Sequence, residues 1–150
     1  MRDSALQVTM AGIIGAAVMD LLMYLLLLFG VKTTSPWLVA ADVFLAPGYI
    51  NTASGVVIGL IGTVALSTAA AVAVYLILKI TGYDYAVLKG ILTVNAFGFI
   101  TMGMFMPTLK IAPQVQSQPV TNFMALLVLT ITGTAIAMAL RIFNTRKIKE

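Results

Sequence analysis

The 150-residue chain contains no cysteine and no histidine. Without cysteine it has no disulfide, no thiolate nucleophile and no ligand for an iron–sulfur cluster. Without histidine it lacks a common protein ligand of zinc, copper and haem, and the side chain that most readily moves protons near neutral pH. We therefore expect no metal or other cofactor, and no redox chemistry.

Charged side chains are scarce as well. Only 9% of the residues are charged, whereas 61% are hydrophobic and the mean hydropathy is +1.05. A soluble domain has about 25% charged residues, so too few polar side chains are present here to cover a surface in water. The net charge of +4 lies largely near the C-terminus and forms no basic stripe interleaved with aromatics. We predict a lipid bilayer as the surroundings and no nucleic-acid partner.

Motifs of enzyme chemistry are also missing. The sequence contains no glycine-rich phosphate loop, no nucleophile–base pair and no paired carboxylates. We therefore expect that the protein is not an enzyme.

The chain has instead several long apolar segments, each able to cross a bilayer as a helix. We predict one all-α domain over residues 1–150, a polytopic membrane protein with four transmembrane helices. The expected spans are residues 8–30, 53–78, 85–106 and 121–142, after a short polar lead-in at residues 1–7. The first span is too long for a cleaved signal and contains an acid. We expect Pro107 to end the third span.

The first outer connection contains a short apolar segment, residues 36–47. Ser35 followed by Pro36 is typical of a helix start, and Pro47 with Gly48 of a helix end. The segment is too short to span the membrane, so we predict a short interfacial helix, with a re-entrant loop as the alternative. The polar, proline-containing connection of residues 107–121 is expected to lie in water.

Lysine and arginine are distributed unevenly between the two predicted sides. Positively charged connections stay in the cytoplasm. We therefore predict a multi-pass protein of the cell membrane with both termini cytoplasmic. The richer side would hold Arg2, Lys79, Lys89, Arg141, Arg146, Lys147 and Lys149, and the other side Lys32 and Lys110.

Small residues recur every four positions on the first two predicted spans. Such rows let helix backbones approach closely, which is a main basis of helix association in lipid. We predict that these rows pack against another helix of this chain or against a second copy. The rows are Gly12 and Ala16 on the first span, and Gly55, Gly59, Thr63, Ser67 and Ala71 on the second.

Each predicted span carries polar residues near its middle. An ionised carboxylate at that depth costs about 2.5–3.5 kcal/mol, and no basic residue lies deep enough to pair with Asp20. We expect Asp20 to be mostly protonated and to interact with Asn95, directly or through water. The site would be a neutral contact between helices or a proton or cation site in a transport path. The predicted layer contains Asp20, Ser67, Thr68, Asn95, Thr132 and Thr134.

Two other groups suggest less. Asp42 is expected on the wet side of the interfacial helix rather than at a pore mouth. Met102, Met104 and Met106 alternate along a helix and therefore fan out around it. We expect them to fill gaps in packing rather than to bind a soft metal ion.

GIIGAAVMDLL at residues 12–22, the long outer connection and GYDYAVLKGI at residues 82–91 resemble the YqhR-like group, small four-helix membrane proteins of spore-forming Firmicutes. The resemblance implies a polytopic bacterial membrane protein and assigns no functional residue.

The sequence thus favours a non-enzymatic integral membrane protein that acts through helix packing, as a small membrane subunit or a homo-oligomer. Its partners would be the bilayer and a membrane protein or a second copy. The alternative is a small oligomeric transporter or channel that uses Asp20 as a proton or cation site.

Overall fold

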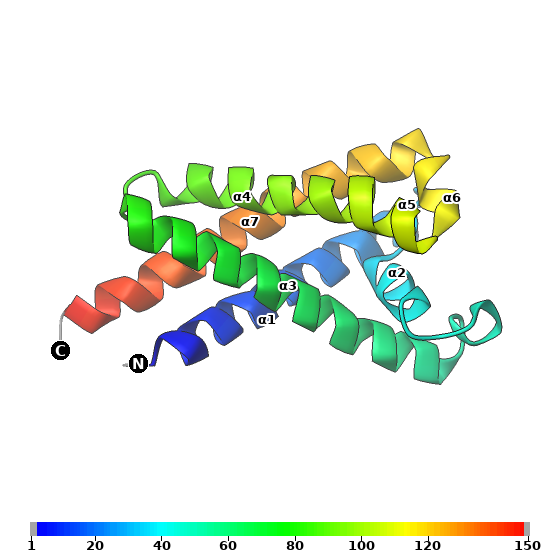
Figure 1. Ribbon diagram of the computed structural model, residues 1–150, viewed down its shortest axis with the longest axis horizontal. Helices are drawn as coiled ribbons and strands as arrows, with labels where there is room; N and C mark the ends of the chain where they lie inside the picture. The colour runs from blue at the N-terminus through cyan, green and yellow to red at the C-terminus, as the bar shows by residue number, and fades with distance from the viewer. Residues whose placement is uncertain (1–2, 149–150) are drawn as a thin grey trace.

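The structure is a computed structural model that describes residues 3–148, apart from the side chains of residues 114, 116 and 146–148. The described part is all-α (Figure 1). Its long helices are α1 (Ser4–Leu28), α3 (Ala53–Thr81), α4 (Ala86–Ile100) and α7 (Pro119–Ile148). The shorter elements are α2 (Pro36–Asp42), η1 (Pro47–Tyr49), the π-helical turn η2 (Thr101–Phe105), α5 (Met106–Leu109) and α6 (Pro113–Gln116).

Four stretches of the described chain are long and apolar enough to cross a membrane: Ser4–Leu28, Ala53–Thr81, Ala86–Leu109 and Pro119–Thr145. Their outward-facing side chains are large and apolar. Leu21 is 59% exposed, Ile61 65% and Phe99 63%. Such a surface requires lipid as its solvent. The predicted fold class, with a short helix between the first two spans, is confirmed.

The four spans form a ring. α1 and α4 each pack mainly against α3 and α7, so that α1 and α4 occupy opposite corners. The two chain ends lie at the same end of the bundle in Figure 1, as an even number of crossings requires. That end is called the terminal end below, and the end that holds α2, α5 and α6 is called the far end.

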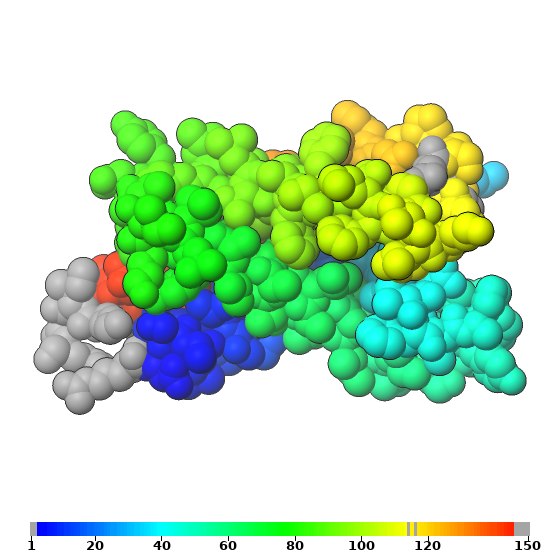
Figure 2. Space-filling view, in the orientation of Figure 1, coloured from blue at the N-terminus to red at the C-terminus, as the bar shows by residue number. Residues whose placement is uncertain are grey.

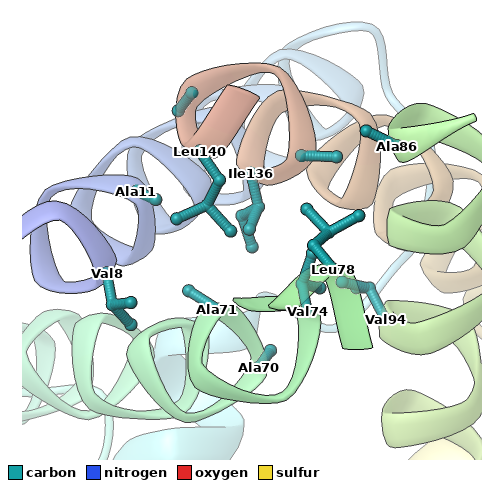
Figure 3. Close-up of a cluster of buried hydrophobic side chains, with 12 residues drawn as sticks. Val8, Ala11, Ala70, Ala71, Val74, Leu78, Ala86, Val94, Ile136 and Leu140 are labelled. Atoms are coloured by element: carbon teal, nitrogen blue, oxygen red, sulfur yellow. The ribbon is translucent and has the colours of Figure 1, made fainter. Parts of the chain in front are cut away.

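The buried apolar core lies in the half of the bundle nearer the terminal end. Val74 and Leu78 of α3 meet Ile136 and Leu140 of α7 there, with Val94 of α4 beside them (Figure 3). These side chains are almost completely buried. The larger of the two buried apolar clusters of the described residues therefore lies near the chain ends.

The row of small residues on α3 is buried and used inside this chain. Gly55 lies against the backbone of Tyr49 and Ile50, and Gly59 lies against the backbone of Trp37. A Cβ at either glycine would collide with main-chain atoms, which cannot move aside as the end of a flexible side chain could. The row that could have joined two copies thus packs against the first connection and α1.

Glycines also set the contacts between the long helices. A Cβ at Gly12 of α1 would lie 2.6 Å from the Cα of Thr68 on α3. A Cβ at Gly90 of α4 would lie 2.7 Å from the carbonyl oxygen of Gly133 on α7. Ala16, predicted on the packing face of α1, is buried. Close backbone approach therefore joins both helix pairs, as expected in lipid.

The first span begins earlier than predicted, so the polar lead-in at residues 1–7 is wrong where the structure describes it. Asp3 caps α1 by accepting a hydrogen bond from the Ala5 N–H at 2.8 Å. An aspartate at this position satisfies a free N–H of the first turn. Gln7 is already buried in the bundle.

Pro107 does not end the third span. The Met106 N–H donates to the carbonyl of Thr101, which closes the wider π-helical turn η2 directly before the proline. Pro107 then lies in the first turn of α5, directly after the π-helical turn. The span therefore continues to Leu109.

The connection predicted to lie in water folds back onto the bundle. It forms α6, and Ala112 and Val115 are buried together with Met106. The predicted helix of residues 36–47 is present but shorter, as α2, and its Ala40 and Ala41 are buried. Both short elements close the far end.

Gly59→Ala tests the close approach to Trp37. We expect the free energy of unfolding to fall by about 1–3 kcal/mol, because the added methyl group meets backbone atoms. The measurement is SDS-induced unfolding in mixed micelles, followed by the fluorescence of Trp37, the one tryptophan of the chain. Gly103→Ala is the control, since a Cβ at Gly103 has no neighbour within 4 Å. Equal stabilities of the two variants would contradict the packing described.

Candidate functional site

The acid of the first span faces α3. Thr63 Oγ1 lies 2.7 Å from Asp20 Oδ2 and 2.9 Å from the carbonyl oxygen of Leu60. A threonine hydroxyl has one proton to donate, and a carbonyl can only accept. Thr63 Oγ1 therefore donates toward both acceptors, the carboxyl of Asp20 and the carbonyl of Leu60, and shares its one proton between them. The neutral carboxyl expected for Asp20 stays a prediction.

Asp20 and Asn95 make no direct hydrogen bond to each other, so the direct form of the predicted interaction is wrong, whereas an interaction through water stays a prediction. Asn95 Nδ2 donates to Thr130 Oγ1 on α7 and to the carbonyl of Ile91 on its own helix, each at 3.0 Å. The physical reason is the ring order of the helices, because α1 and α4 lie at opposite corners. Asp20 bonds across to α3, and Asn95 bonds across to α7.

The other residues of the predicted polar layer do not join these two bonds. Thr68 lies against Gly12, and Thr134 donates to the carbonyl of Thr130 at 3.0 Å. The hydroxyls of Ser67 and Thr132 are buried without a hydrogen-bond partner, as is Asp20 Oδ1. Within the described residues, no group of acidic, histidine or cysteine side chains could hold a metal ion.

A cavity of about 150 Å³ lies between the four spans. It extends from mid-depth, at Ser67 and Thr132, to the far end, where Pro36 of α2 and Val115 of α6 border it. Its exposed surface is almost entirely apolar. The bulkier lining side chains are Met19, Met23, Phe97, Met102, Met106 and Leu129.

The three alternating methionines divide between two surroundings. Met102 and Met106 are four residues apart and both line the cavity. Met104 lies between them in sequence and is 65% exposed on the outside of the bundle. The π-helical turn η2 includes Met102, so the irregular part of the third span borders the cavity.

Asp42 holds the far end together. Its Oδ2 accepts a hydrogen bond from the Ala112 N–H at 2.6 Å, which ties the end of α2 to the segment before α6. Ala112 has a positive φ of 42° and therefore presents its N–H outside a regular helix. The prediction that Asp42 lies on the wet side of an interfacial helix missed this role. No short-range pattern relates two residues so far apart in sequence.

A second concave surface lies outside the bundle, between α2 and α3. This outer groove has a volume of about 500 Å³. Ala65 and Ala69 of α3 are exposed in it, whereas Phe44 and Ile61 stand at its sides. Sequence reasoning singled out the neighbouring row through Gly59 and overlooked this one.

No family model, curated protein or solved structure matches this chain. The resemblance to the YqhR-like group therefore stays a prediction. The fold itself defines the class, which is a multi-pass membrane protein with a four-helix bundle.

Proposed function

We propose that this protein is a non-enzymatic membrane subunit that binds a transmembrane helix of a partner in the outer groove between α2 and α3. The observation that carries the proposal is the exposure of Ala65 and Ala69 in a concave, lipid-facing surface. Helices in lipid associate where small residues let two backbones come close. Phe44 and Ile61, which are 71% and 65% exposed, would pack along the sides of the incoming helix.

The internal use of the first small-residue row supports this choice of surface. Gly55 and Gly59 are buried under the chain's own first connection, so they offer nothing to another molecule. The groove keeps its alanines accessible. A second copy of this chain and a different membrane protein are both compatible with an apolar groove, and the mass of the complex distinguishes them.

We also propose that the protein lies in the cell membrane with both termini on the cytoplasmic side. The terminal end of the bundle carries Lys79, Lys89 and Arg141, and the far end carries Lys32 and Lys110. Lys89 Nζ donates to the carbonyls of Thr81 and Gly82 at 3.1 and 2.9 Å, where it completes the end of α3. The positive-inside rule supports this orientation.

Ala65→Leu combined with Ala69→Leu tests the groove. The larger side chains should fill the groove and keep a partner backbone away, so the complex extracted in mild detergent should dissociate to the mass of a single chain. Light scattering during size-exclusion chromatography measures that mass, and in-membrane crosslinking before extraction confirms it.

The control is the same pair of changes at Ala17 and Ala96, which are exposed outside the groove. This variant should keep the wild-type mass. A wild-type protein that already has the mass of one chain, or a complex that survives filling of the groove, would contradict the proposal.

The transport alternative has one observation in its favour. Asp20 Oδ1 is buried and lacks a hydrogen-bond partner, which leaves a free position for a proton or cation. Our proposal predicts that Asp20→Asn leaves both the fold and the ion permeability of reconstituted liposomes unchanged, because asparagine can still bond to Thr63. A pH-dependent flux in wild-type liposomes that Asp20→Asn abolishes would favour transport instead.

A further inference from the structure

We propose that the cavity between the four spans binds the end of one acyl chain of a membrane lipid. The site is separate from the outer groove and uses different residues, except that Leu66 of α3 borders both. Binding of an acyl chain in the cavity can therefore be tested separately from binding of a partner helix in the outer groove.

The lining fits a hydrocarbon chain. The exposed surface of the cavity is almost entirely apolar, although its lining residues include Thr34, Thr63, Ser67, Thr101, Thr121 and Thr132. The hydroxyl oxygens of Ser67 and Thr132 are themselves buried. A water molecule needs two to four polar partners, and so little exposed polar surface offers few of them. A dry cavity of about 150 Å³ accepts a benzene-sized group, so about six chain carbons can enter.

Methionines make this lining adaptable. Met19 and Met23 of α1 and Met102 and Met106 of the third span all line the cavity. Their unbranched, polarisable side chains can repack around a flexible chain whose position varies. A cavity built for one rigid ligand would need fixed polar groups to orient it.

The route into the cavity is sideways, from the bilayer. In Figure 1, α3 and α4 are close at the turn that joins them and diverge toward the far end. In Figure 2 the surface is hollowed between them, and atoms coloured as α1 show at depth. Leu66 of α3 and Phe97 of α4 both line the cavity.

The aqueous end is closed by contrast. Pro36 and Val39 of α2 and Val115 of α6 cover the cavity there, and the hydrogen bond from the Ala112 N–H to Asp42 holds these two short helices together. A ligand from water would have to open this cover, whereas acyl chains already surround the lateral opening. We infer that the cavity opens toward the hydrocarbon of the bilayer.

The test uses the full-length protein in vesicles of phosphatidylcholine with a photoactivatable diazirine near the end of one acyl chain. After illumination, the labelled residues are identified by peptide mass spectrometry. A chain inside the cavity should label Met23 and Met106, which are only 2% and 5% exposed. Met104, 65% exposed to the bilayer, reports ordinary contact with surrounding lipid.

Ala125→Leu narrows the cavity, because Ala125 is part of its lining. We expect labelling of Met23 and Met106 to fall at least about fivefold relative to Met104. The matched change Ala96→Leu, on the lipid-facing side of α4, should leave the ratio unchanged.

Labelling of Met104 without labelling of Met23 and Met106 in the wild-type protein would overturn the proposal, and this result needs no variant to fold. Labelling of the buried methionines that is equal in Ala125→Leu and Ala96→Leu would overturn it as well, because the label would then have reached them by another route.

Discussion

The structure depends on the close approach of α3 to the backbone of the residues before and beside it. In lipid no hydrophobic force draws one helix to another, so van der Waals contact between backbones must hold the bundle. Gly59 packs directly against the main chain of Trp37, and Gly12 of α1 packs directly against Thr68. These contacts fix α2 and α1 on one helix, and α7 and α4 complete the ring through Gly90 and Gly133.

The helices are packed differently in the two halves of the bundle. The positions of the cavity and of the outer groove follow from this difference. Near the chain ends, Leu78 and Leu140 fill the space between helices. Toward the far end α3 turns away from α4 to receive α2, and the side chains no longer meet in the centre. The cavity lies inside this wider half, and the outer groove lies on its surface. Asp42 then closes the end that packing alone leaves open.

Hydropathy was enough to predict the four spans, since their length and composition are properties of the sequence alone. The row of small residues through Gly59 could also be predicted, since its four-residue spacing is a property of the sequence. The segment that packs against it, at Trp37 and Tyr49, could not. The order of helices around the ring depends on contacts between distant segments, so Asp20 could not be assigned to Thr63 in advance. The π-helical turn before Pro107 and the bond from Ala112 to Asp42 likewise arise only once the helices are packed.

The most direct measurement of this arrangement is disulfide formation between introduced cysteines, because the chain has none of its own. Asp20→Cys paired with Thr63→Cys should crosslink rapidly under mild oxidation in native membranes. In the wild-type protein, Asp20 Oδ2 and Thr63 Oγ1 are only 2.7 Å apart. Asp20→Cys paired with Asn95→Cys should stay reduced under the same conditions. Rapid crosslinking of the second pair and not the first would contradict the account, because α1 would then face α4 rather than α3.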